Sequence, residues 1–293
     1  MTWFLIALSS AFLSAFAAVT QKKVLFGRGA LEFTFVLSIF NLVLSAPFFF
    51  FVDYSTVNWL NSSVLLLKSG LAAGAFLCVM TVLKNMEISR ALPLLALTPG
   101  FVAVFAFFFL GESLSITDIS GLFLLIAGTY ILESGNLKDI LLPFSTFIRS
   151  ENHHYVLLAL VFFTAAAILD KILLVKLNFT PVTIIAFQHL IFAVLFAVIF
   201  LLFGKKNSEK GRLFRKEDIG WILLISVVTI GYRYTNILSF SLASVALTLA
   251  VKRTSVLWAT IIGGKIFNET NLLRKIIAVL FILSGVFLIL NGI

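Results

Sequence analysis

Cysteine and charged residues are scarce in this chain. Only 12% of the 293 residues are charged and 61% are hydrophobic, whereas roughly a quarter of residues are charged in ordinary soluble domains. A single cysteine, Cys78, leaves no disulfide framework and no cysteine-rich metal site. Enzyme motifs such as HExxH and GxSxG are missing, and no paired carboxylates share a helix face. The sequence therefore predicts no enzyme, no cofactor and no metal site.

Long apolar runs fill most of the chain and give it a mean hydropathy of +1.12. Crossing a bilayer takes about 20 such residues per helix, and the runs lack the alternation of a membrane barrel strand. We predict an all-α integral membrane protein with ten transmembrane helices and no soluble domain. The predicted spans are Thr2–Val19, Phe33–Phe51, Val64–Val82, Ala91–Leu110, Ile119–Leu132, Tyr155–Val175, Val182–Phe203, Ile219–Leu238, Ala243–Gly264 and Leu272–Leu290.

The second half of the sequence repeats the first. AAVTQKKVLF at residues 17–26 matches AAAILDKILL at residues 165–174, and an apolar helix ends on a glutamate in each half. Because five helices per half is an odd number, the second half must enter the membrane from the opposite side. We therefore predict two inverted five-helix repeats, residues 1–150 and 151–293.

The net charge of +9 is unevenly distributed. Most lysines and arginines lie in or beside the connections after odd-numbered spans, and only Lys68, Lys171 and Lys176 fall on the other side. By the positive-inside rule, the odd-numbered connections are cytoplasmic and both termini lie outside the inner membrane. We expect lipid headgroups to be the partners of these charges. A nucleic-acid partner is not predicted, because the basic run 205–218 has no interleaved aromatic residue besides Phe214.

This organisation resembles the drug/metabolite transporter superfamily, and specifically its EamA type. The resemblance rests on the two five-helix halves, on the fourth helices that end in LGES (110–113) and FNET (267–270), and on the glycine-containing fifth helices. It implies an alternating-access carrier with a central cavity lined by helices one, three, four, six, eight and nine. It also implies cytoplasmic termini, whereas the basic residues indicate the reverse, and we follow the charges.

Three cations are expected at mid-membrane depth: Arg233, Lys252 and Arg253. A charge at the centre of a span costs on the order of 2.5–3.5 kcal/mol, which indicates a function. Arginine offers a planar fork and lysine a point charge, so together they suit an anion. Other residues of this predicted substrate site are Tyr232, Tyr234, Asn236, Thr248 and Ser255; the last two share a helical stripe with Lys252.

The resemblance adds a hint about the dipeptide Lys252-Arg253. In the organic-phosphate translocators of the superfamily, a Lys-Arg pair on the ninth helix holds the substrate phosphate, and this pair is similar in type and helix. The alternative is structural: both cations could pair with a buried acid, of which Asp170 is the best placed. Asp170 and Lys171 are in turn open to two interpretations, a coupling carboxylate for a proton or a simple ion pair.

Pro93 and Pro99 interrupt the fourth predicted span and are expected to bend it into a gate. The sequence as a whole predicts a secondary transporter of a small polar metabolite, with an anion favoured and with a proton or a counter-substrate as the candidate coupling partner. One alternative is an exporter of amino acids or amphipathic drugs, in which aromatic residues such as Trp258 would matter more than the cations. The other is a membrane scaffold that transports nothing.

Overall fold

The computed structural model describes residues 2–98, 100, 115–133, 150–204, 216–242 and 251–292. Within these ranges the chain forms helices and turns and no strand, as predicted. The α-helices are α1 (Thr2–Leu25), α2 (Ala30–Ser45), α3 (Trp59–Asn85), α4 (Ile88–Leu95), α6 (Ile116–Glu133), α8 (Glu151–Lys171), α9 (Pro181–Phe203), α10 (Lys216–Leu242), α12 (Ser255–Ile266) and α13 (Leu272–Gly292). Short 3₁₀ turns follow α2 at Ala46–Phe51 and Tyr54–Thr56, and a π-helical turn, Ile172–Lys176, extends α8.

Seven of these helices are long and apolar enough to cross a membrane. With the shorter α6, α4 and α12, each of the ten predicted spans contains a described helix. Most ends differ from the prediction, because helices continue past their apolar centres: α3 begins at Trp59 rather than Val64, and α1 ends at Leu25 rather than Val19. The parts of the fourth and ninth predicted spans that contain Pro99 and Thr248 lie outside the described residues.

The ninth predicted span is not one continuous regular helix. Residues 251–253 are helical, Thr254 forms a turn, and α12 begins at Ser255. At the turn, the backbone N–H groups of Thr254 and Leu257 donate to carbonyls three residues back rather than four. The stripe that would place Lys252 and Ser255 on one face of a regular helix is therefore interrupted at Thr254.

Local sequence explains several of the helix starts. The side chain of Asn58 accepts from the N–H of Asn61 and so caps α3, while Thr180 caps α9 by accepting from the N–H of Thr183. Pro181 occupies the first position of α9, where its missing N–H costs nothing. Large apolar side chains such as Phe50 and Leu201 are exposed, as expected for surfaces that face lipid.

The helices pair in a pattern that is unchanged when the two repeats are exchanged. The second helices of the repeats, α2 and α9, pack together, as do the fourth helices, α4 and α12, and the fifth, α6 and α13. The first helix of each repeat packs on the third helix of the other, in the pairs α1 with α10 and α3 with α8. This exchange symmetry places the interior of the protein between the two halves.

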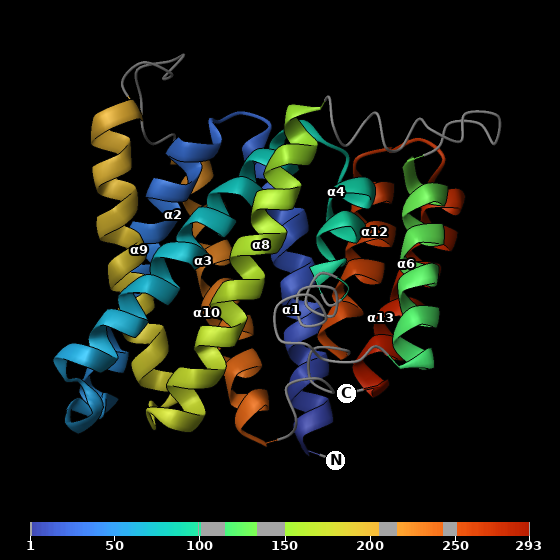
Figure 1. Cartoon of the computed structure of the whole chain (residues 1–293). Helices are drawn as coiled ribbons and strands as arrows, with labels where there is room; N and C mark the ends of the chain where they lie inside the picture. Colours follow the sequence, from blue (N-terminus) through green and yellow to red (C-terminus); the bar gives the residue numbers. More distant parts are fainter. Residues whose placement is uncertain are drawn as a thin grey trace.

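The halves are also inverted relative to each other (Figure 1). Helix α1 starts at the lower end of the bundle, near the label N, whereas α8, the first helix of the second repeat, starts at the upper end and runs down. Helix α13 ends at the lower end, so both ends of the chain lie on the same side of the bundle. The prediction of inverted repeats is confirmed.

Glycines let α6 and α13 approach to backbone contact. A Cβ atom at Gly285 would lie 2.6 Å from the carbonyl oxygen of Gly121, and one at Gly128 would lie 2.9 Å from that of Ala278. Only a residue without a side chain fits at such positions, which is how helices pack closely in membranes. The glycines of the fifth helices, noted in the sequence, therefore hold the two repeats together.

Candidate functional site

Lys68 is buried inside the bundle. It lies nine residues into α3, about 13 Å along the helix axis from its start, and is only 2% exposed. Its ammonium group lies 2.8 Å from a carboxylate oxygen of Asp170 on α8 and donates to the side chain of Gln188 on α9 at 2.7 Å. The sequence-based placement of Lys68 at the membrane surface was wrong.

Arg233 lies at the matching depth on the symmetry-related helix, nine residues before the end of α10. Its guanidinium carbon is 5.6 Å from the centre of the Phe76 ring on α3 and 5.0 Å from that of Phe192 on α9. Such cation–π contacts hold the group in place without using its hydrogen-bond donors. One of these donors, Nη1, is buried and has no hydrogen-bond partner in the described part of the chain.

Lys252 and Arg253 lie just before the turn at Thr254. The Lys252 ammonium group is 6.0 Å from the centre of the Tyr232 ring, which brings together two residues of the predicted site. The Nε atom of Arg253 is buried and has no partner within the described ranges. The expected structural partner, Asp170, forms its ion pair with Lys68 instead, although its charge still reaches Lys252.

The remaining residues of the predicted site are more dispersed. Tyr234 packs on Phe48, with ring centres 6.1 Å apart, beside an apolar cluster rather than against the cations. Asn236 is half-buried and its carbonyl accepts from the Ser239 hydroxyl. Ser255 opens α12. Pro93 lies inside α4, whereas Thr248, Pro99 and the side chain of Lys171 are not among the described parts.

His189 has unusual surroundings for a residue of an apolar helix. It follows Gln188 in α9 and is 1% exposed, and neither ring nitrogen has a hydrogen-bond partner among the described residues. The charges of Arg233 and Lys68 both act on it. The available signal was the polar pair Gln188-His189 in an otherwise apolar helix, but its neighbours come from α3 and α10 and cannot be read from spacing.

A second polar cluster lies at the opposite end of the bundle, where α4 begins. The carboxylate of Glu269, whose side chain is 3% exposed, accepts from the N–H groups of Ile88 at 2.6 Å and Ser89 at 3.0 Å, and from the Ser89 hydroxyl. The ammonium groups of Lys22 and Lys275 lie 4.0 Å and 3.9 Å from it. Glu269 thus caps α4 of the first repeat from the second repeat.

Lysines of this cluster also bind other protein groups. Lys22 donates to the carbonyls of Leu83, at 3.3 Å, and Met86 at the end of α3, and Lys275 donates to Glu87 at 2.7 Å. Lys22 and Lys275 are 5% and 7% exposed. The expectation that such basic residues contact lipid headgroups was wrong for these two, because each is taken up by carbonyl or carboxylate groups of the protein.

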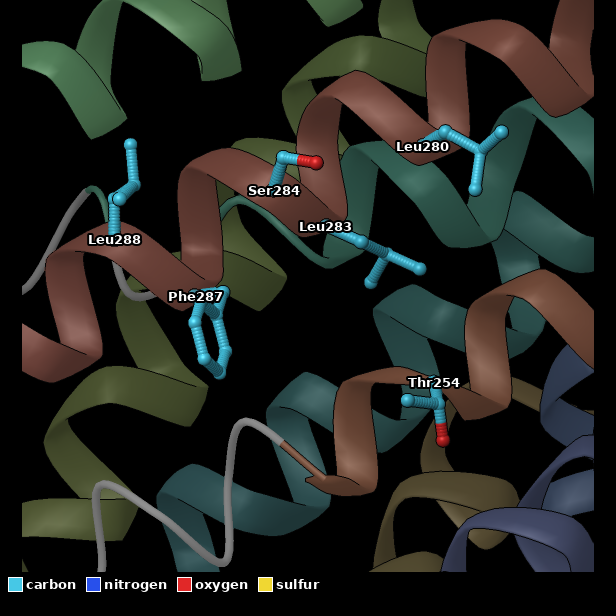
Figure 2. A pocket seen from close by; sticks show the side chains of 6 residues that line it. All are labelled: Thr254, Leu280, Leu283, Ser284, Phe287 and Leu288. Atoms are coloured by element: carbon cyan, nitrogen blue, oxygen red, sulfur yellow. The ribbon is translucent and has the colours of Figure 1, made fainter.

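A cavity of about 430 Å³ lies between Thr254 and α13 (Figure 2). Four of the described residues around it are apolar, and Thr254 and Ser284 supply its hydroxyl groups. The lining of this cavity is thus mainly apolar, whereas the site around Arg233 is positively charged. Among the described residues, no group of three or more His, Cys, Asp or Glu side chains could hold a metal ion.

Comparison with known proteins settles the class of this fold. The model of the EamA-like transporter family matches residues 1–134 and, again, residues 153–291. The chain belongs to the EamA-like transporter family. A crystal structure described only as that of a protein superposes with a TM-score of 0.66 at 16% identity, and the match covers 98% of this chain and 97% of the other. No curated protein matches the sequence.

Membership confirms the resemblance to the drug/metabolite transporters and the two-repeat membrane architecture. The protein is thus a multi-pass membrane transporter of the drug/metabolite type. The substrate of this transporter must be compatible with the cations Arg233, Lys252 and Arg253 if it binds at their site.

Proposed function

We propose that this EamA protein is a secondary transporter of a small anionic metabolite, bound between the repeats by Arg233, Lys252 and Arg253. One observation carries the proposal: Arg233 and Arg253 each keep a buried N–H donor without a hydrogen-bond partner among the described residues. An unsatisfied donor on a buried charged group is costly. A carboxylate or phosphate of the substrate would satisfy both donors and neutralise the charge.

The charge balance supports the same substrate class. Lys68 is buried, Arg233 and Arg253 each have a buried nitrogen, and Lys252 is half-buried. Among the described residues, the acid that interacts with this group of four cations is Asp170. Four positive charges and one negative charge leave a net charge of +3. In a membrane interior such an excess requires a counter-ion, and a bound anion supplies it. Tyr232, against Lys252, would orient the substrate.

Asp170 is the candidate coupling group of the transporter. It lies inside the bundle as the counter-ion of Lys68, where a proton or a counter-substrate could exchange with it. We further propose that the protein resides in the inner membrane with both termini outside, because the basic last turns of α1 and α3 lie at the end of the bundle opposite the start of α1 and the end of α13. Pro93, and Pro99 beyond the described part of α4, are the proposed gate in helix four.

Thermal stability against a panel of ligands tests the substrate class. We would measure the melting temperature of the purified protein in detergent with phosphorylated, carboxylated, zwitterionic and cationic metabolites. An anion at 100 times its Kd should stabilise the folded state by about 2.7 kcal/mol. Lys252→Ala should abolish this effect and leave the melting temperature without ligand close to that of the original protein. The exposed Lys176→Ala serves as the matched control.

Other outcomes contradict the proposal. Stabilisation only by cations or amphipathic amines would favour an exporter of such compounds. Stabilisation by none of the compounds would favour a scaffold. If Lys252→Ala unfolds the protein without ligand, the lysine has a structural role.

A further inference from the structure

We infer that the EamA protein has a second anion-binding subsite, formed by Lys68, His189 and Arg233, and that its substrate carries two separate anionic groups. The inference rests on the proposed function, since it extends the same central site. The first subsite contains Lys252 and Arg253 at the turn before α12. The second lies between α3, α9 and α10.

Helix α10 separates the two subsites. Neighbouring residues on a helix point about 100° apart, and Tyr232 and Arg233 illustrate this directly. The ring of Tyr232 faces the ammonium group of Lys252 at 6.0 Å, whereas the guanidinium group of Arg233 contacts the rings of Phe76 and Phe192. Lys252 and Arg233 therefore contact different neighbours around α10, and we assign Lys252 with Arg253 to one subsite and Arg233 to the other.

His189 shares the second subsite with Arg233. It precedes Phe192 by three residues in α9, so both side chains lie on the same helix face, and Phe192 is the residue that holds Arg233. The imidazole is 1% exposed and both nitrogens lack a partner in the described part of the chain. A neutral imidazole has one donor and one acceptor, so this ring keeps a free N–H for a ligand oxygen.

Lys68 completes the subsite and has donor capacity left. An ammonium group has three donors, of which Gln188 accepts one and Asp170 pairs with another. Lys68 and Asp170 cancel each other in charge, which leaves the excess on Arg233, Lys252 and Arg253. One monoanion would reduce a net charge of +3 to +2, whereas a substrate with two anionic groups reduces it to +1. The charge balance and the different neighbours of Lys252 and Arg233 thus favour a dianion.

Matched ligand pairs test the inference. The probes are dicarboxylates of four to six carbons and a phosphorylated carboxylic acid, each compared with its carboxyl monoamide, which keeps the shape and removes one charge. Binding would be measured by melting temperature and calorimetry on the purified protein in dodecyl maltoside. Because a hydrogen bond to a charged group contributes about 1.5–3 kcal/mol, we expect dianions to bind roughly 10- to 100-fold more tightly than their monoamides.

His189→Phe isolates the second subsite while it keeps an aromatic ring in the core. We expect this variant to lose the preference for dianions and to bind monoamides as the original protein does. Its control is His154→Phe, at an exposed position near the start of α8. Arg233→Gln should weaken the binding of dianions more than that of monoamides.

The outcomes separate this inference from the proposed function. Equal affinity for dianions and monoamides, or equal losses for both in His189→Phe, would overturn the second subsite and leave the anion transporter in place. Failure of every anion to bind would overturn both.

Discussion

The ammonium group of Lys22 binds protein groups rather than lipid headgroups. At the end of α1 it donates to two carbonyls at the end of α3, and it lies 4.0 Å from the Glu269 carboxylate. The last carbonyls of a helix have no partners within the helix, and a cation at that end is also favoured by the helix dipole. One side chain thus joins the first and third helices of one repeat to the fourth helix region of the other.

Replacing Lys22 should therefore destabilise the fold. In Lys22→Met the side chain keeps about the same length and its apolar contacts. Two carbonyls and the buried Glu269 lose the ammonium group, which should lower the free energy of unfolding by roughly 2–4 kcal/mol. The measurement is the melting temperature in detergent. The adjacent Lys23→Met is the control, because Lys23 is exposed and its ammonium group lies 4.0 Å from the centre of the Trp221 ring. Equal effects of the two substitutions would contradict the assigned role.

Glu87 should give the stability a component that depends on pH. Burial would raise the pKa of this carboxyl, but the hydrogen bond and charge of Lys275 outweigh it and lower the pKa below the ordinary value of 4.5. A depressed pKa contributes stability above the unfolded-state value, and this contribution is lost as the pH falls through the folded-state value. The carboxylate is 39% exposed, so the effect is small.

The test compares the melting temperatures of the original protein and Glu87→Gln between pH 7 and pH 3. We expect the original protein to melt higher at pH 7, and the two curves to converge as the pH falls below 4.5. A constant difference over the whole range would show that Glu87 acts by packing rather than by charge.

The sequence identified the deep cations Arg233, Lys252 and Arg253 by the cost of placing charge in an apolar span. It missed Lys68, because the predicted third span began at Val64 and left the lysine near the membrane surface, whereas α3 begins at Trp59. It recognised Asp170 as a buried acid but not its partner. Helix periodicity shows which residues share a face of one helix. It cannot show the pair Lys68–Asp170, because that pair joins two helices from different repeats.

Helix α4 depends on a residue that is distant in the sequence. Its eight residues include Pro93, and its own N-cap residue, Glu87, makes no capping hydrogen bond with its side chain. Glu269 supplies the cap instead. A short helix interrupted by proline has little stability of its own, so contacts with the second repeat must hold its start in place.

We expect Glu269→Ala to lower stability by about 3 kcal/mol or more, because it removes the cap of α4 and the carboxylate beside Lys22, and leaves Lys275 paired with Glu87 alone. Glu269→Gln should cause a smaller loss of stability than Glu269→Ala, since an amide oxygen can still accept from the N–H of Ile88. Glu151→Ala is the control: this acid is exposed in the first turn of α8. Hydrogen exchange should locate the loss at residues 88–95. Exchange that rises equally everywhere would argue against a local cap.

The contact between α6 and α13 differs from the cap of α4, because it is made by glycines and not by charged side chains. Gly285→Ala places a methyl group 2.6 Å from the carbonyl oxygen of Gly121 and 2.9 Å from the N–H of Leu125. Backbone atoms cannot move aside as side chains do, so we expect a loss of about 1–3 kcal/mol or more. Gly70→Ala on α3 meets nothing within 4 Å and should be neutral or slightly stabilising. Melting temperatures of the two variants give the comparison.

At the scale of elements, composition and repeat structure predicted the ten spans and their division into halves. The helix ends were less predictable, since α1 and α3 continue through polar residues that the bundle buries. The interruption at Thr254 also depends on context. The sequence placed Lys252 and Ser255 on one helical stripe, but it could not show that the helix is interrupted between them.

The whole molecule combines symmetry of packing with asymmetry of charge. Exchange of the repeats preserves which helices touch, yet among the described residues the two polar clusters differ in content. The cluster at Glu269 ties helices of both repeats together at the upper end of the bundle, whereas the cations around Arg233 lie nearer the end where α1 begins and α13 finishes. The described contacts thus join the repeats by ion pairs at the basic end, and leave unpaired donors in the interior.

The asymmetry of charge also predicts the orientation of the protein, which the positive-inside rule and family resemblance assign oppositely. We would place a single cysteine at either end of the bundle, Thr2→Cys or Lys84→Cys, in a Cys78→Ala background; both positions are exposed, and they lie at opposite ends. Treated in whole cells with a maleimide that cannot cross membranes, Thr2→Cys should be labelled and Lys84→Cys should react only after the cells are opened. The reverse pattern would place the termini in the cytoplasm. The buried lysines would then explain why the positive-inside rule failed. Lys22 and Lys275 are paired with carboxylates of the protein, so they would not act as free charges that set the orientation.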